Sequence, residues 1–244
     1  MSLSNLLKKI ADSEPGPETC ALFDFDGTII SGYSATAFLK DQIARGELSP
    51  ADLIQLTQAA TRFGIGSLGF SALMAVHAQY LAGRSESEYI ANSERLFRRA
   101  IAKLVYPEAR QLIDAHRAKG HSIAIISSAT PYQVIPAAKD LGIDNVYATD
   151  LEVVDGYFTG SVVTPTCFGE GKVLAAEAFA EDHGGSVDRS FFYSDSTDDI
   201  ALLETVGYPV VLNGSKQLRV IAAEKRWPSA DFSSRGNASG GEIM

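Results

Sequence analysis

Two groups of aspartates stand directly after apolar segments, where their carboxylates could do chemistry. The first group is Asp24 and Asp26 in the run DFDGT, which follows the strand-like run TCALF. Side chains two residues apart project to the same side of an extended backbone. Burying both carboxylates costs several kcal/mol unless a cation neutralises them, so the pair indicates a Mg²⁺ site. On its own, an Asp-x-Asp-Gly run can also be a solvated turn.

The second group follows another apolar run, FFY, and adds three carboxylates in the run YSDSTDD. If Asp195 and Asp199 join Asp24 and Asp26 at one edge of a sheet, the four acids are hard to stabilise without a divalent metal. Helix capping is the alternative, because Asp195 or Ser196 would cap the next helix well. Capping needs only one acid, however, so the number of carboxylates favours the metal site.

The remaining candidate site residues are three hydroxyl-bearing residues and one lysine. Ser127, Ser128 and Thr130 follow the apolar run IAII and precede Pro131. Hydroxyls and free backbone N–H groups at a helix N-terminus form a phosphate-binding corner, although the same residues are ordinary helix caps. Lys172 stands in a predicted first helical turn, where the macrodipole disfavours a cation, so its placement indicates a purpose beyond a solvated surface charge.

The segments that must position these residues alternate between strand and helix patterns. Predicted strands cover 19–25, 122–126, 145–149, 190–193 and 209–212, and predicted helices cover 107–119, 132–141, 171–182 and 198–205. This alternation predicts an α/β fold, a Rossmann-like doubly wound parallel sheet that binds ligands at the carboxyl ends of its strands. The Asp155-Gly156 pair predicts the turn of a hairpin that joins 151–154 to 157–163.

Helical spacing of apolar residues from 34 to 103 interrupts this series and predicts an all-helical cap inserted after the first strand. We therefore expect a core of residues 17–33 and 104–228, a cap of residues 34–103, and a disordered tail of residues 229–244, which are rich in Ser, Gly and Asn. Side chains of the insert that could face a ligand are Arg62, Phe63, Phe70, Tyr80 and Phe97. Core packing or a solvated helix face explains each of them more simply.

Composition limits the partners. The chain has 244 residues and a net charge of −9, which argues against a nucleic-acid partner. A small anionic ligand stays compatible, because a local cation can dominate the field of one site. Cys20 and Cys167 show no metal spacing and are expected to be buried or incidental thiols. No apolar run of about 18 residues occurs, so we expect no transmembrane segment and a cytoplasmic protein.

Four pieces occur in a characteristic order: DFDGT, an apolar strand ending in Ser127, Lys172 opening a helix, and an apolar strand followed by DSTDD. Together they resemble the signature motifs of the haloacid dehalogenase-like phosphatases, over residues 21–212. The helical insert is similar to the cap of the subgroup that contains the phosphoserine phosphatases. The resemblance implies a Mg²⁺-dependent phosphatase that hydrolyses a small phosphorylated metabolite through an aspartyl phosphate.

The resemblance also implies the roles of the residues that bind and transfer the phosphoryl group. Asp24 is the expected nucleophile, and Asp26 the expected general acid and base. Ser127 and Lys172 are expected to bind the transferring phosphoryl group. We also assign Thr28 and Ser128 to substrate binding.

A Mg²⁺ ion would be held by the Asp24 carboxylate, the Asp26 backbone carbonyl and Asp195. Asp199 would bind a metal water or orient Lys172. The neighbouring Asp198 fits a simple first-turn helix acid.

Tyr33 stands where the phosphoserine phosphatases carry a glutamate that reads the serine amine, so phosphoserine is disfavoured as the substrate. Glu47 or Asp52 of the insert could still supply a carboxylate. A dehalogenase is a weaker alternative, because it would have no use for the metal-site acids. A phosphotransferase and a non-catalytic phosphate-binding module of the same fold remain open. Some similar chains are fused to a lipid acyltransferase domain.

Overall fold

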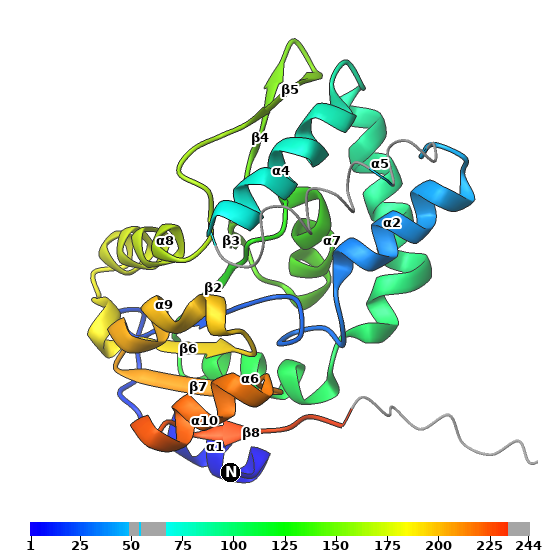
Figure 1. Cartoon of the computed structure of the whole chain (residues 1–244). Helices are drawn as coiled ribbons and strands as arrows, with labels where there is room; N and C mark the ends of the chain where they lie inside the picture. The colour runs from blue at the N-terminus through cyan, green and yellow to red at the C-terminus, as the bar shows by residue number, and fades with distance from the viewer. Residues whose placement is uncertain (49–53, 55–66, 234–244) are drawn as a thin grey trace, which may run out of the picture.

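The protein is an α/β structure in which one six-stranded sheet carries helices on both faces (Figure 1). The computed structural model describes residues 1–48, 54 and 67–233. The strands of the sheet are β1 (Cys20–Phe23), β2 (Ser122–Ile126), β3 (Asn145–Tyr147), β6 (Phe191–Ser194), β7 (Tyr208–Leu212) and β8 (Ser229–Ala230). The flanking helices are α1 (Leu3–Ala11), α6 (Pro107–Ala118), α7 (Pro131–Leu141), α8 (Glu170–Asp182), α9 (Ile200–Thr205) and α10 (Lys216–Lys225).

The order of the strands places β1 and β6 side by side in the middle of the sheet. The order is β3-β2-β1-β6-β7-β8, and every neighbouring pair is parallel. The chain proceeds from β1 to β3 on one side and from β6 to β8 on the other, so the strand order reverses between β1 and β6. In such sheets, ligands bind outside the carboxyl ends of the strands at this point. The predicted doubly wound parallel sheet is confirmed.

The apolar run of β1 is explained by burial on both faces of the sheet. Ala21 and Phe23 pack on one face, in a cluster with side chains of α1, α6 and α7. Cys20 and Leu22 pack on the opposite face, with side chains of α8, α9 and α10. Strands covered on both sides are apolar throughout instead of alternating with polar residues. Cys20 and Cys167 are both free and buried, as expected.

Three helices of the described residues lie between β1 and α6, at the end of the molecule away from α1 and α10 (Figure 1). They are α2 (Ser34–Ala44), α4 (Ser67–Leu81) and α5 (Glu86–Leu96). The chain leaves α5 through a π-helical turn (Phe97–Ile101) and a 3-10 turn (Ala102–Leu104). The predicted hairpin is present beside them, as β4 (Leu151–Val154) and β5 (Tyr157–Val162). Its turn uses positive φ angles at Asp155 and Gly156, as the Asp-Gly pair predicts.

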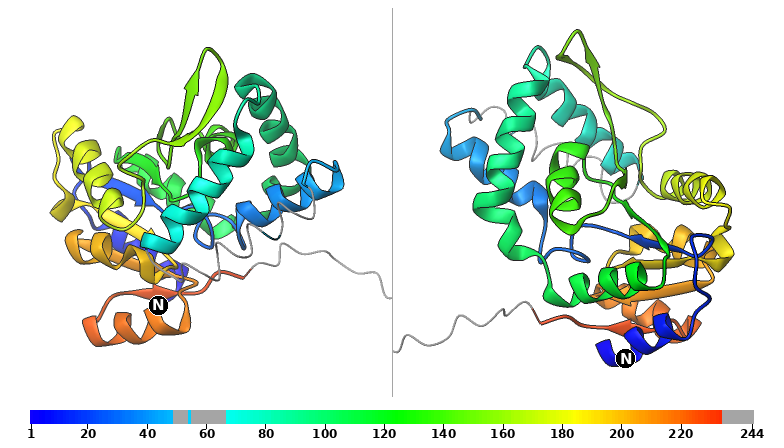
Figure 2. Two further views of the ribbon diagram at one scale, coloured as in Figure 1. Left: turned by 45° about the horizontal axis from the view of Figure 1, so that its top comes forward. Right: turned by 180° about the vertical axis from the view of Figure 1, so that it is seen from behind.

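The hairpin packs against the inserted helices, and both views of Figure 2 show it beside α4. Gly160 of β5 approaches the end of α4 so closely that an added Cβ would lie 3.1 Å from the Cβ of Ala82. Tyr89 of α5 meets Tyr132 of α7 and Phe158 of β5, with ring centroids 5.1 and 5.5 Å apart. The inserted helices, the hairpin and α7 therefore share one packed aromatic contact. The division into core and cap remains a prediction.

The candidate ligand-facing residues of the insert have ordinary packing roles where the structure describes them. Phe70 stacks on Phe168 with ring centroids 4.4 Å apart. Tyr80 donates a hydrogen bond to the backbone carbonyl of Glu47 at 3.2 Å, and Phe97 is buried. Arg62, Phe63 and Asp52 lie outside the described residues.

The prediction of a disordered tail from position 229 is wrong for its first residues. Ser229 and Ala230 form β8, which pairs with β7 in parallel. Phe232, two residues further on, is only 9% exposed. A two-residue strand leaves no periodic pattern in the sequence, because backbone hydrogen bonds to the sheet edge stabilise it. Residues 234–244 lie outside the described residues.

Candidate active site

Lys172 lies at the centre of the carboxylate cluster. Its ammonium donates hydrogen bonds to Asp24 Oδ1 at 2.8 Å and Asp199 Oδ2 at 2.9 Å, and the residue is only 2% exposed. The helix that carries it begins in a crowded turn, where a Cβ on Gly171 would lie 1.8 Å from the carbonyl oxygen of Thr166. Only glycine fits this close approach. This tight turn fixes the start of α8, and Lys172 in its first turn reaches Asp24 at the end of β1.

The residues that follow β6 hold the second acid group in place. Ser194 Oγ donates to Asp199 Oδ2 at 2.6 Å. Ser196 caps the short 3-10 turn by accepting a hydrogen bond from the backbone N–H of Asp198 at 3.1 Å. Capping is therefore done by the serine, which leaves Asp195 available for another role. Asp199 instead pairs with Lys172.

The DFDGT loop closes directly over Asp195. A Cβ on Gly27 would lie 2.1 Å from Asp195 Oδ2, and Gly27 has a φ of +76°. Both observations require glycine in this position. The backbone N–H of Asp24 bonds the carbonyl of Tyr193 at 2.9 Å, which continues the β1–β6 pairing up to the candidate nucleophile. The structure therefore brings the DxD loop and the acids after β6 together, as the sequence predicts.

Asp26 is held by the first residue of α2. Its Oδ1 accepts a hydrogen bond from the backbone N–H of Ser34 at 2.7 Å, and its Oδ2 accepts one from Ser34 Oγ at 3.0 Å. Both carboxylate oxygens therefore contact the same residue at a helix N-terminus, where the helix dipole favours a negative charge.

Burial dominates the electrostatics of the carboxylates. It raises the pKa of Asp24 to about 7, against the opposing effect of Lys172. It raises the pKa of Asp26 to about 6, against the hydrogen bonds from Ser34. Burial, together with the negative charges of Asp24 and Asp199, raises the pKa of Asp195 to about 8. Burial therefore disfavours the charged form of all three carboxylates, and their full ionisation would leave more negative charge than Lys172 can neutralise.

Lys172 itself stays charged. Burial would lower the pKa of Lys172, but the negative charges of Asp199 and Asp24 outweigh this effect and raise it above its ordinary value. A permanently charged ammonium among carboxylates is suited to hold an anionic group that enters the site.

The donor chemistry around Asp195 fits a Mg²⁺ ion. Among the described residues, no group of three or more His, Cys, Asp or Glu side chains is arranged as a metal site. Mg²⁺ keeps several waters, however, and one or two carboxylates are enough to hold it. The raised pKa of Asp195, which a bound cation would lower, and the close fit of the Gly27 loop around its carboxylate are consistent with such a site. The residues that would hold the ion are Asp24, Asp195 and the backbone carbonyl of Asp26.

The candidate phosphate-binding hydroxyls lie at the end of β2, next to β1, where Ile125 pairs with Phe23. Ser127 is 1% exposed, and its Oγ accepts a hydrogen bond from the backbone N–H of Ala129 at 3.2 Å. Ser128 is half-buried. Thr28 is fully buried, and its Oγ1 has no hydrogen-bond partner among the described residues. No direct hydrogen bond joins these three residues to Asp24 or Lys172 in the part of the chain that the structure describes.

Sequence reasoning missed three side chains that support the loop. Ser34 holds Asp26, and Gln133 of α7 donates to Ser34 Oγ at 3.1 Å. Asn213, directly after β7, donates to the carbonyl of Gly27 at 2.8 Å. The strand-end rule that selected Asp24 and Asp195 also applies to Asn213. No comparable signal marks Ser34 or Gln133, whose contacts join segments far apart in the chain.

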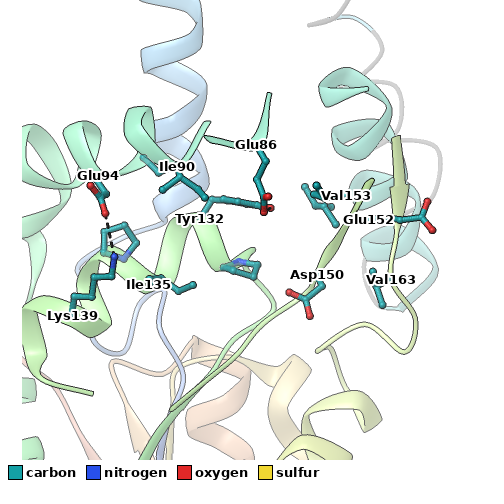
Figure 3. Close-up of a pocket in the computed structure, with 14 residues that line it drawn as sticks. Glu86, Ile90, Glu94, Tyr132, Ile135, Lys139, Asp150, Glu152, Val153 and Val163 are labelled. Carbon is teal, nitrogen blue, oxygen red and sulfur yellow. Dashed lines mark hydrogen bonds and ion pairs between the residues drawn. The ribbon is translucent and has the colours of Figure 1, made fainter. Parts of the chain in front are cut away.

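A pocket of about 620 Å³ between α5, α7 and β4 does not belong to this cluster (Figure 3). Its apolar wall includes Ile90 and Ile135, and Glu86 accepts a hydrogen bond from Tyr132 Oη at 2.8 Å. Carboxylates of Glu86, Asp150 and other residues line it, and they would repel a phosphate. None of the candidate catalytic residues is among its lining residues.

The chain belongs to the haloacid dehalogenase-like hydrolase family, whose model matches residues 21–204. The predicted resemblance is thereby confirmed, and the chain is an enzyme of this hydrolase class.

Related proteins include phosphatases. A phosphoserine phosphatase of Mycobacterium tuberculosis is 33% identical, with 87% of this chain and 70% of that protein aligned. A histidinol-phosphatase of Neisseria meningitidis is 29% identical, with 87% and 98% aligned. The expectation of a phosphoric monoester hydrolase is confirmed at this level.

Solved structures share the fold. A Bordetella pertussis protein of unknown function superposes with a TM-score of 0.79 at 28% identity, covering 88% of this chain and 99% of that one. An aspartyl-phosphate analogue complex of a phosphoserine phosphatase superposes with a TM-score of 0.61 at 21% identity, over 86% and 91% of the two chains. Separately, none of the helices within the described residues has the length and apolar character needed to cross a membrane.

Proposed function

We propose that the protein is a Mg²⁺-dependent phosphatase that hydrolyses a small phosphate monoester through an aspartyl phosphate on Asp24. The observation that carries the proposal is the buried Lys172 ammonium between Asp24 and Asp199, at 2.8 and 2.9 Å. A buried ammonium beside a nucleophilic carboxylate is what an anionic substrate needs, because it offsets the repulsion between two negative groups. The phosphatase relatives support the same reaction class.

In the proposed reaction, Asp24 attacks phosphorus and Lys172 holds an oxygen of the transferring phosphoryl group. A bound Mg²⁺ would supply charge stabilisation for the equatorial oxygens. Asp26 gives a proton to the leaving alkoxide and then takes a proton from the water that hydrolyses the aspartyl phosphate. Its pKa, raised to about 6, is compatible with both tasks near neutral pH. Ser127, Ser128 and Thr28 are proposed to contact the substrate.

We propose a leaving group other than serine. Tyr33 is 63% exposed and precedes α2. The negative charge of Asp195, with burial and Asp26, raises the pKa of the Tyr33 phenol, so this ring lies near the carboxylates. A phenol offers an apolar ring and a hydroxyl, which suit a neutral leaving group better than a zwitterion. Glu47 does not compensate, because its carboxylate pairs with Arg45 and Arg84.

The experiment is a screen of phosphorylated metabolites, among them phosphoserine, histidinol phosphate, sugar phosphates and lipid phosphates, with released phosphate as the readout. We expect turnover that requires Mg²⁺ and a value of kcat/KM for phosphoserine about tenfold or more below that of the best substrate, because the ammonium loses a carboxylate partner. A clear lead for phosphoserine would refute the role of Tyr33. Full activity after chelation would refute the metal.

A further inference from the structure

A chain of buried hydrogen bonds leads from the start of α7 to Asp26. Gln133 Oε1 accepts from the backbone N–H of Thr130 at 2.9 Å and from Thr130 Oγ1 at 3.0 Å. Gln133 Nε2 donates to Ser34 Oγ at 3.1 Å, and Ser34 Oγ donates to Asp26 Oδ2 at 3.0 Å. Thr130 and Ser34 are 0% exposed and Gln133 is 6% exposed, so water does not compete for these bonds.

The direction of every hydrogen bond in this chain is fixed by one backbone group. The N–H of Thr130 can only donate, so the atom of Gln133 that faces it must be the carbonyl oxygen. The amide nitrogen of Gln133 then faces Ser34 and donates to it. Since the Ser34 hydroxyl accepts this bond, its single hydrogen is directed to Asp26. The orientation of the Ser34 hydroxyl therefore depends on Gln133.

The two ends of this hydrogen-bond chain belong to different parts of the candidate site. Thr130 and Gln133 lie in the turn and first helical turn after Ser127, on the side of β2. Ser34 begins α2, the first helix of the insert, and Asp26 lies in the loop after β1. One glutamine thus connects the proposed phosphate-binding corner to the proposed general acid.

We propose that Gln133 is a positioning residue for Asp26, acting through Ser34, and that it is needed when the leaving group must be protonated. This inference rests on the proposed function. Ser34 already bonds both oxygens of Asp26. Gln133 holds the Ser34 hydroxyl in the rotamer and polarity that keep the Asp26 carboxyl in one orientation. Asp26, protonated at a position that Ser34 does not occupy, then donates that proton to the leaving oxygen.

The role predicts a dependence on the leaving group. A p-nitrophenolate ion leaves without a proton, whereas the more basic phenolate benefits from general-acid assistance. The two phenyl esters have nearly the same shape, so binding differs little between them. The value of kcat/KM reports only the steps up to transfer of the phosphoryl group to Asp24, because that step releases the phenol. The comparison therefore isolates the acid role of Asp26 from its later role as a base.

The experiment measures kcat/KM of the 244-residue chain, supplied with Mg²⁺, for phenyl phosphate and p-nitrophenyl phosphate. Gln133→Met keeps the length and volume of the side chain but removes both polar atoms. We expect this variant to lose about tenfold or more on phenyl phosphate and less than about twofold on p-nitrophenyl phosphate. Ser34→Ala should show the same pattern. The double variant should lose no more than Ser34→Ala alone, because Gln133 acts through Ser34.

Tyr132→Phe is the matched control. It removes a hydrogen bond from the neighbouring residue of the same helix to Glu86 of α5, at 2.8 Å, without touching the chain to Asp26 (Figure 3). This variant should retain the wild-type ratio of the two kcat/KM values.

Equal losses on both esters in Gln133→Met, or fully additive losses in the double variant, would overturn the positioning role. If Gln133→Met does not fold, Ser34→Ala and Ser34→Thr decide instead, since only the threonine keeps the hydroxyl and the wild-type ratio. A wild-type enzyme that releases phosphate from neither ester, nor from any metabolite in the screen, would refute the proposed function itself.

Discussion

The neighbours of Asp24 indicate that removal of its charge would affect catalysis but not the stability of the fold. The carboxylate accepts a hydrogen bond from Lys172 at 2.8 Å, but Lys172 also has Asp199 as a partner at 2.9 Å. Removing the charge of Asp24 therefore leaves the ammonium paired. It also relieves the repulsion that helps raise the pKa of Asp195.

Asp24→Asn should abolish phosphate release while the fold is kept, because the amide is nearly isosteric with the carboxylate but cannot attack phosphorus. Phosphate release and thermal unfolding of the purified variant test this. We expect a melting temperature within a few degrees of that of the wild type and no phosphoenzyme after mixing with substrate. Substantial residual turnover would refute the assignment of Asp24 as the nucleophile.

Asp195→Asn should weaken Mg²⁺ binding at least about tenfold, since one anionic ligand of a hard cation is lost. Titration calorimetry with Mg²⁺ measures the affinity directly, without reliance on activity. Asp198→Asn is the matched control, because Asp198 is more exposed and makes no ion pair with Lys172. Equal Mg²⁺ affinities in the two variants would contradict the assignment of Asp195.

At the residue scale, the sequence predicted the acids and the lysine but not the groups that orient them. Asp24, Asp195 and Lys172 stand at strand ends and a helix start, and parallel strands bring such positions to one edge. Gln133 and Ser34 are 99 positions apart, and their contact depends on how the first turns of α2 and α7 meet in the folded protein. No spacing rule within one segment contains that information.

At the scale of the elements, the loop after β1 is held by a residue at the end of β7, two strands away in the sheet. Asn213 follows β7 in the left-handed region, at φ +53°. Its Nδ2 donates to the carbonyl of Gly27 at 2.8 Å, and its Oδ1 accepts from the N–H of Phe232 at 2.7 Å. One side chain therefore joins the DxD loop, the end of β7 and the segment after β8.

Asn213→Ala should lower the free energy of unfolding by about 2–4 kcal/mol, because it loses two hydrogen bonds and strains a left-handed backbone. Asn213→Gly removes the same bonds without the backbone strain, so it should be less destabilising. Both variants should also lower kcat, since the carbonyl of Gly27 loses its support. Urea unfolding and phosphate release measure the two effects. Asn145→Ala, which loses one bond to Ile123 at the sheet edge, should leave kcat unchanged.

Strands β1, β2, β3, β6 and β7 were predictable as short apolar runs, and helices α6, α7, α8 and α9 as segments of helical pattern, each with a turn signal beside it. Helices α1 and α10 were not predicted. The hairpin followed from Asp155-Gly156 in the same way. β8 could not be predicted, since a two-residue strand is formed by its backbone and by the burial of Phe232. The sequence predictions therefore miss β8, which is added to an existing sheet edge, and they also miss α1 and α10, which each bury only two side chains.

At the scale of the whole molecule, a second polar chain crosses the core on the face of α6. His121 Nε2 donates to the carbonyl of Glu14 at 2.9 Å, because a carbonyl can only accept. His121 Nδ1 must then accept from His116 Nδ1 at 2.8 Å, and His116 Nε2 accepts from the hydroxyl of Tyr193 at 2.8 Å. Every nitrogen is satisfied when both imidazoles are neutral. A further proton on His121, without a change of tautomer at His116, would place two N–H groups against each other.

This chain of hydrogen bonds makes the stability of the folded protein depend on pH. Burial, with a smaller effect of His121, lowers the pKa of His116 to about 3 from its ordinary value of 6.5. Burial also lowers the pKa of His121. Above pH 6.5 both states are neutral and the stabilisation is complete. As the pH falls toward 3, the unfolded chain binds protons that the folded chain does not bind, so the free energy of unfolding decreases.

We expect the free energy of unfolding to fall by up to about 1.4 kcal/mol per pH unit across this window because of His116, and His121 should add to the loss below pH 6.5. Urea unfolding at several pH values measures the slope. The double variant His116→Phe with Tyr193→Phe should have a smaller slope. The active-site carboxylates, whose raised pKa values act in the opposite direction, are common to both proteins and cancel in the comparison. Titration of His116 near neutral pH in NMR spectra would contradict the assignment.

The ends of the described chain meet at β8, where the terminal ammonium of Met1 donates to the carbonyl of Ser229. The exposed turn at Asp155-Gly156 lies in the hairpin, outside the six-stranded sheet. A circularly permuted gene that links the two ends and opens at Gly156 would keep every strand of that sheet intact. In such a protein, β6 and its acids would be synthesised before β1 and Asp24, and the nucleophile would join an edge that has already formed.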